Sequence, residues 1–142
     1  MISTWTPLWS DIIASSVWSE PDHVRLLWIT MLAMKDMDGF VGASVNGLAR
    51  MANLTCEQVE EGLKVLQSPD PYSRTKDFEG RRIVVEEGGW RILNHQKMID
   101  RIKRERKKTA DRLRARELRV GKMPRPYLDA ESAAELKGCN AG

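Results

Sequence analysis

Arginine and lysine side chains are the groups in this 142-residue sequence best suited to one kind of chemistry, the binding of phosphates. Residues 100–125 hold 12 of them against 4 acidic residues, a balance of +8, whereas residues 1–99 hold 10 against 13, a balance of −3. A cationic arm on a neutral-to-acidic body is typical of proteins that bind a polyanion. A solvated charged helix is the alternative explanation. We expect phosphate contacts from Arg101, Lys103, Arg104, Arg106, Lys107, Lys108, Arg112, Arg114 and Arg116.

A single helix is expected to carry these cations, over residues 96–120, with a stop at Gly121 and Pro124 beyond it. Its apolar positions are too sparse for a coiled-coil seam. Like charges three and four residues apart repel, so the helix is marginal by itself and could become ordered only against a polyanion. The expected organisation is a domain over residues 1–95, a basic arm over 96–121, and a flexible tail over 122–142 with a short helix in it.

The residue pattern does not predict a catalytic site. The carboxylates lie in solvated runs, no Ser-His-Asp arrangement can be placed, and Gly88-Gly89 lacks the helix and lysine of a phosphate-binding loop. Cys56 and Cys139 lie 83 positions apart, with only His23 and His95 besides, too little for a zinc site or a disulfide framework. We therefore expect no enzyme activity, no metal and no cofactor.

Residues 45–66, VNGLARMANLTCEQVEEGLKVL, predict a helix-turn-helix at the centre of the domain. Asn53 suits the left-handed corner, Leu54 turns back toward the core, and Thr55 with Gln58 forms a capping box for the second helix. An ordinary helical hairpin is the alternative. The buried positions are expected to be Leu48, Ala49, Met51 and Ala52 on the first helix and Val59, Gly62, Leu63 and Leu66 on the second.

Two helices are expected before this hairpin. Residues 7–18 have apolar side chains at helical intervals, with Trp9 and Trp18 as core anchors. Ser19 is expected to cap the next helix, which runs to about Lys35. Its buried stripe is expected to be Val24, Leu27, Trp28, Met31 and Leu32.

Extended segments complete the predicted domain. Residues 40–43 are a short extended piece, and residues 68–72 are a stiff proline-containing turn. Residues 81–85 and 90–93 are two strands joined by a glycine turn. Helix, short strand, two helices and hairpin is the order of a winged helix. The predicted fold is therefore mainly α with a small β-hairpin, a winged helix-turn-helix domain followed by a long basic C-terminal helix.

The second helix of the hairpin would face a nucleic acid with Thr55, Gln58 and Lys64 as candidate groove contacts. Three acidic residues on the same helix oppose phosphate attraction and equally indicate a protein-binding surface; they are Glu57, Glu60 and Glu61. Further candidate phosphate contacts lie on or just before the wing; they are Arg74, Lys76, Arg81 and Arg82.

Residues 9–94 resemble a family of small phage and prophage winged-helix proteins similar to the N-terminal part of phage replisome organisers. The resemblance implies a role in phage DNA replication, with a phage or host replication protein such as a helicase as partner. We expect no second folded domain of the kind that engages helicase within these 142 residues. The pieces that carry the resemblance are Asp38-Gly39, Leu48-Ala49, the turn SPDPYSRT at 68–75, Gly80-Arg81-Arg82-Ile83 and Gly88-Gly89-Trp90.

The sequence thus predicts a non-enzymatic DNA-binding protein whose arm and wing contact phosphates. A protein-interaction module, which self-associates or docks on a replication protein through its acidic helix, is the second reading. A phage transcriptional regulator that reads a palindrome as a dimer is the third. The start, MISTWTPLWSD, is unlike a signal peptide, and no apolar run is long enough to span a membrane. We expect the protein in the cytoplasm of a bacterial host.

Overall fold

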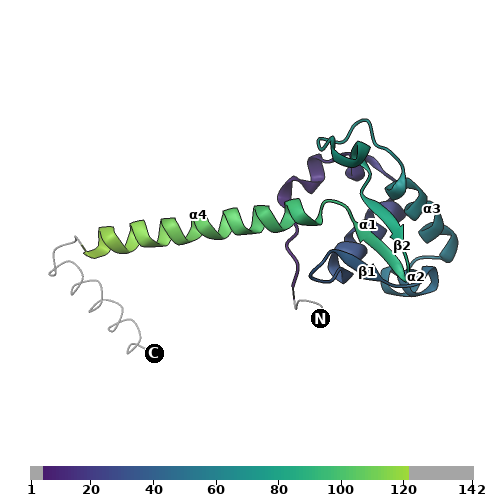
Figure 1. Cartoon of the computed structure of the whole chain (residues 1–142), viewed down its shortest axis with the longest axis horizontal. Coiled ribbons are helices and arrows are strands. Elements are labelled where there is room, and N and C mark those ends of the chain that lie inside the picture. The colour runs from purple at the N-terminus through teal and green to yellow at the C-terminus, as the bar shows by residue number, and fades with distance from the viewer. Residues whose placement is uncertain (1–4, 122–142) are drawn as a thin grey trace, which may run out of the picture. The chain divides into compact units, whose positions relative to one another are not determined.

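The computed structural model describes residues 5–121, and the chain divides into two units, Met1–Met98 and Ile99–Gly142. The predicted tail over 122–142 lies outside the described residues. Unit 1 is mainly helical with a small antiparallel sheet, and unit 2 contains most of the long helix α4 (Figure 1). No helix among the described residues is both long enough and apolar enough to cross a membrane.

The first ordered segment is two short 3-10 helices, η1 (Ser10–Ala14) and η2 (Ser16–Ser19), so the prediction of one helix over residues 7–18 is wrong. Ser15 is extended between them, and its hydroxyl donates to the carbonyl of Ile12 at 2.6 Å. A serine bond of this kind competes with the helical ladder. Trp9 and Trp18 are only partly buried, whereas Trp28 and Trp90 are the tryptophans of the core.

Helix α1 (Asp22–Met34) buries the predicted stripe in full. Ser19 does not cap it, because Ser19 belongs to η2 and the helix starts three residues later. Pro21 stands at the N-cap, and its carbonyl accepts from the amides of Val24 and Arg25. Proline fits there because an N-terminal helix position needs no amide donor.

Helices α2 (Val45–Ala52) and α3 (Cys56–Gln67) form the predicted hairpin. Asn53 has the left-handed conformation, with φ 55° and ψ 48°, and both bonds of the capping box between Thr55 and Gln58 are present. All four predicted positions of α3 are buried. Met51 is 65% exposed, so its prediction as a core residue is wrong: α2 is only two turns long and buries Leu48 and Ala49.

The sheet has three strands, β1 (Phe40–Gly42), β2 (Ile83–Glu86) and β3 (Gly89–Ile92), in the order β1-β3-β2. The extended piece before the helical hairpin is thus a strand of the sheet, paired antiparallel with β3 so that Val41 lies opposite Trp90. Ile83 lies opposite Ile92 in the β2–β3 hairpin, and both are buried. The buried core consists mainly of side chains from this sheet and from α1, α2 and α3.

A left-handed turn, η3 (Asp77–Gly80), joins the proline-containing loop to β2. Phe78, Glu79 and Gly80 all have positive φ, at 54°, 58° and 78°. A Cβ at Gly80 would lie 2.3 Å from the carbonyl oxygen of Asp70, so only glycine fits there. The amide of Asp70 in turn donates to the carbonyl of Glu79 at 2.9 Å.

Helix α4 (His95–Gly121) agrees with the predicted basic helix to within one residue at each end. His95 at its start is buried, and its Nε2 lies 2.7 Å from the carbonyl oxygen of Met37. Every residue from 103 to 121 is exposed. The described part of the chain is therefore a packed unit 1 and a solvated basic helix.

Candidate nucleic-acid interface

Helix α4 presents its cations to solvent. Residues 99–121 hold ten lysines and arginines against four acidic residues, a balance of +6. Among the described residues, one ion pair within unit 2 joins Lys108 to Glu105 at 3.3 Å, and Arg101 also has an interaction. The arm is therefore the main reserve of unneutralised positive charge in residues 5–121.

Six of these cations recur every three or four residues and so share one face of α4. We call them the cationic stripe. At 1.5 Å per residue the stripe is about 27 Å long, which corresponds to about eight nucleotides at 3.4 Å each. No Phe, Trp or Tyr occurs in residues 96–121, so the arm offers no stacking surface for unpaired bases. The stripe consists of Arg101, Arg104, Lys108, Arg112, Arg116 and Arg119.

The predicted wing cations are, in contrast, already engaged within unit 1. Arg74 donates to the carbonyl of Asp11 at 3.1 Å, and Lys76 donates to the carbonyl of Pro71 at 3.3 Å. Arg81 pairs with Glu79 at 3.2 Å. These three side chains are exposed and could exchange partners. The charges of Arg74 and Arg81 are paired with those of Asp11 and Glu79, whereas Lys76 contacts only a carbonyl.

Arg82 has a structural role within unit 1. Its side chain is 13% exposed, and its guanidinium lies 3.1 Å from the carboxylate of Asp70, whose side chain is 18% exposed. The hydroxyl of Ser16 accepts from Arg82 at 2.8 Å and donates to Asp70 at 2.5 Å. Burial opposes ionisation of Asp70, but the bonds from Ser16 and Arg82 outweigh it, and the pKa of Asp70 is lowered.

Arg91 on β3 is engaged on the exposed side of the sheet. It donates to both carboxylate oxygens of Glu86, at 2.6 and 2.9 Å, and to the carbonyl of Asp38 at 3.0 Å. These bonds from Arg91 lower the pKa of Glu86. Its guanidinium also lies 5.8 Å from the ring centre of Phe40. The β2–β3 hairpin, which is the predicted wing, therefore has little positive charge to offer a phosphate.

The three predicted groove contacts on α3 differ in whether they are already hydrogen-bonded within the protein. Thr55 and Gln58 satisfy each other, since the Thr55 hydroxyl accepts from the Gln58 amide at 3.1 Å and the Gln58 side chain accepts from the Thr55 amide at 3.0 Å. Lys64 is exposed and has no partner among residues 5–121. Arg50 on α2 shares this property and was not among the predicted residues. Its polar position on an amphipathic helix is the signal that could have identified it.

The acidic side chains of α3 are on the surface as expected. Glu57, Glu60 and Glu61 are exposed, and Glu61 lies 3.2 Å from His23 on α1. Cys56, also exposed, has its sulfur 3.0 Å from the side-chain oxygen of Asn46. Within the described residues no group of three His, Cys, Asp or Glu side chains could hold a metal ion.

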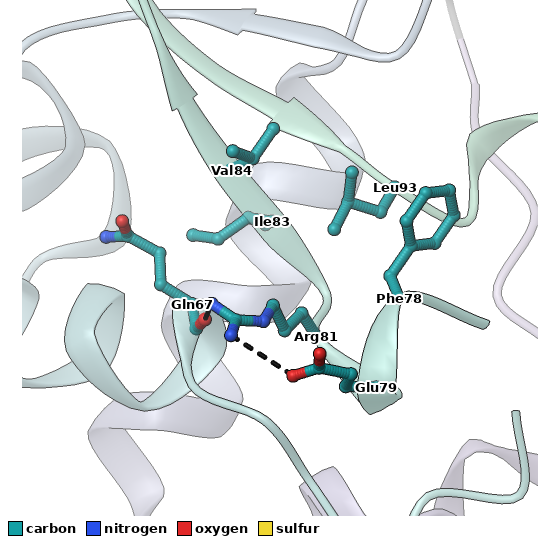
Figure 2. A pocket seen from close by; sticks show the side chains of 7 residues that line it. All are labelled: Gln67, Phe78, Glu79, Arg81, Ile83, Val84 and Leu93. Carbon is teal, nitrogen blue, oxygen red and sulfur yellow. Dashed lines mark hydrogen bonds and ion pairs between the residues drawn. The ribbon is translucent and has the colours of Figure 1, made fainter. Parts of the chain in front are cut away.

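A pocket of about 390 Å³ lies beside the start of β2 and was not predicted from the sequence (Figure 2). Gln67 and Arg81 lie on one side of it, and Phe78 and Leu93 lie on the other. The left-handed turn that places Phe78 has no local sequence signal, because neither Phe78 nor Glu79 favours positive φ. The lining residues are Gln67, Phe78, Glu79, Arg81, Ile83, Val84 and Leu93.

Comparison with known proteins gives no match to a protein family, a curated protein or a solved structure. The charges and contacts of the chain itself therefore carry the functional argument.

Proposed function

We propose that this protein binds DNA without catalysing a reaction, and that α4 supplies the phosphate contacts. The observation that carries the proposal is that the cations of unit 1 and those of α4 differ in how many have a partner within the protein. In residues 5–98 only Arg50 and Lys64, of ten lysines and arginines, have no partner among the described residues, whereas most cations of α4 have none. Phosphate neutralisation supplies most of sequence-independent DNA affinity.

The domain that precedes the arm supports assignment to the winged-helix class. Its element order is α1, β1, α2, α3, β2 and β3, with a left-handed corner and a capping box between α2 and α3. A helix-turn-helix with a β-hairpin is a frequent DNA-binding architecture. The role in phage DNA replication, and a phage or host replication protein as partner, are proposed only from the resemblance of residues 9–94 to phage proteins.

Salt dependence of duplex binding tests the arm. We expect the variant Arg112→Gln/Arg116→Gln to reduce the slope of log K against log salt by about 2, since each phosphate contact contributes about 0.9. Fluorescence anisotropy with a labelled duplex at several salt concentrations measures the slope.

The matched control removes two exposed cations of the predicted wing that are engaged within unit 1, Arg74 and Lys76, which donate to the carbonyls of Asp11 and Pro71. Arg74→Gln/Lys76→Gln should leave the slope almost unchanged. Equal losses in the two double variants would contradict the arm as the DNA contact and would favour the wing.

The second candidate function is protein docking through α3, which the exposed Glu57 and Glu60 favour. Glu57→Lys/Glu60→Lys separates the two uses of this helix. A helix that lies against DNA should bind a non-specific duplex about tenfold more tightly after this reversal, because two repulsive charges become attractive. Unchanged affinity, with intact folding by circular dichroism, would leave α3 free for a protein partner.

A further inference from the structure

The edge of the sheet formed by β2 has the properties of an interaction surface. The order β1-β3-β2 leaves one side of β2 without a neighbouring strand. Val84 and Val85 on this strand are 40% and 61% exposed. Exposed apolar edge strands readily pair with another chain, and proteins usually protect them with lysine, proline or a covering segment. β2 has neither lysine nor proline.

The hairpin register identifies which backbone groups face the open side. Glu86 lies opposite Gly89 across the turn, and the amide of Leu93 donates to the carbonyl of Arg82 at 2.9 Å. Bonded and non-bonded pairs alternate along an antiparallel ladder. The amides and carbonyls of Ile83 and Val85 therefore point away from β3, and in the described chain no backbone bond joins them to a segment outside the sheet.

We propose that β2 pairs antiparallel with β2 of a second copy of this chain, with Val84 opposite Val84 at the two-fold axis. Ile83 of each copy then exchanges two backbone hydrogen bonds with Val85 of the other. An isologous contact of this kind uses the same surface on both copies and closes after two. The inference does not depend on DNA binding.

Charge selects this register over its neighbours. With Val84 on the axis, Arg81 lies opposite Glu87, a pair of opposite sign. Glu87 is exposed and has no partner among the described residues. A shift that places Ile83 on the axis sets Arg81 against Val85 and loses this charge pair. A shift to Val85 sets Glu87 against Ile83 and loses the charge pair as well. Opposite charges across strands stabilise a pairing and like charges weaken it.

The pocket beside β2 fits this arrangement. It lies at the Arg81 end of the strand (Figure 2), which is the end that the partner's hairpin turn reaches when the strands run antiparallel. Arg81 and Gln67 offer polar groups to the partner's Glu87. Phe78, 54% exposed, and Leu93 form its apolar wall. The second copy thus covers both the open strand and the pocket.

Sedimentation equilibrium of the full chain, free of nucleic acid, tests the proposal from low micromolar to millimolar concentration. We expect a reversible monomer–dimer equilibrium. Val84→Lys should raise the dimer dissociation constant about tenfold or more, because two lysines would meet on the axis. Met37→Lys is the matched control: Met37 is 75% exposed, precedes the opposite edge strand, and should leave the constant unchanged.

A charge exchange then tests the register. Arg81→Glu and Glu87→Arg should each weaken the dimer about fivefold, and the double variant should restore it to about the wild-type value. Thermal melts confirm that each variant is folded. A wild-type chain that stays monomeric, a Val84→Lys variant that dimerises like Met37→Lys, or a double variant no better than the single ones would each overturn the proposal.

Discussion

At the scale of single residues, Arg82 shows how contacts within the fold make a cation unavailable for binding a phosphate. Its sequence neighbourhood, Gly80-Arg81-Arg82, suggests a basic wing. Only folding brings it to Asp70 and Ser16, from segments 12 and 66 positions away. Because a buried charge needs a partner, loss of either member is expected to cost more than the pair itself contributes.

Asp70→Asn tests this cluster through pH. The folded-state pKa of Asp70 lies below its ordinary value, so its carboxylate contributes stability above about pH 4, and this contribution is lost as pH falls through the folded pKa. We expect the variant to unfold at pH 7 with about 2 kcal/mol less free energy than the wild type. The difference should shrink below about pH 4. Urea denaturation at a series of pH values measures it.

The control is Asp38→Asn, on an exposed turn, which should leave the free energy of unfolding almost unchanged. A deficit for Asp70→Asn that stays constant from neutral to strongly acidic pH would show that the charge of Asp70 is not the stabilising element.

Gly62 permits close packing of α3 on α1. A Cβ at this position would lie 2.6 Å from Cδ2 of Leu27, which is fully buried. Gly62→Ala gains about 1 kcal/mol of helix propensity but overpacks the core by about 1–3 kcal/mol. We expect a net loss of about 1 kcal/mol in chemical denaturation. Glu60→Ala, exposed on the same helix, should show no such loss, and a more stable Gly62→Ala would contradict the close contact.

At the scale of elements, α4 differs from α1 and α3 in how it is stabilised. The shorter helices bury an apolar stripe, whereas residues 103–121 of α4 are exposed and repel one another electrostatically. Helices of this kind depend on length and propensity rather than packing. The stability of unit 1 should therefore be independent of the helical state of the arm.

Ala110→Pro tests this independence. Proline in a helix interior costs about 3 kcal/mol, so circular dichroism should show a loss of helix signal. The melting temperature of unit 1 should stay unchanged, while duplex affinity should fall because the cationic stripe is interrupted. Glu60→Pro in α3 is the comparison and should abolish the cooperative transition. Equal destabilisation by both prolines would mean that α4 supports unit 1.

At the scale of the whole molecule, the chain separates a packed unit from a charged arm. Unit 1 neutralises most of its own cations, and unit 2 keeps a balance of +6 over residues 99–121. Each part can therefore be perturbed without the other, and a polyanion should act first on the arm.

Limited proteolysis with trypsin should report this division. Cleavage is expected first between Arg101 and Arg119, because transient opening of an unpacked helix costs little. The sites in residues 25–91 should resist until unit 1 unfolds. An excess of duplex DNA should slow the arm cleavage, and an uncharged polymer such as dextran serves as the control. Early cleavage within unit 1 would contradict the division.

Local chemistry determined what the sequence could predict. The stripe of α1, the buried positions of α3, the left-handed Asn53 and the Thr55 capping box all depend on residues within one or two turns of each other, and the structure confirms them. The basic helix and the glycine turn of the hairpin are confirmed for the same reason.

Tertiary contacts decided the rest. Pairing of β1 with β3, the exposure of Met51 and the partial burial of Trp9 and Trp18 depend on which surfaces meet in space. The partner of Arg82, the left-handed Phe78 and the pocket beside β2 depend on segments far apart in the chain. Periodicity reports which side of an element is apolar; only the folded chain determines which charge finds a partner and which edge stays open, because both depend on distances between segments that the order of residues does not encode locally.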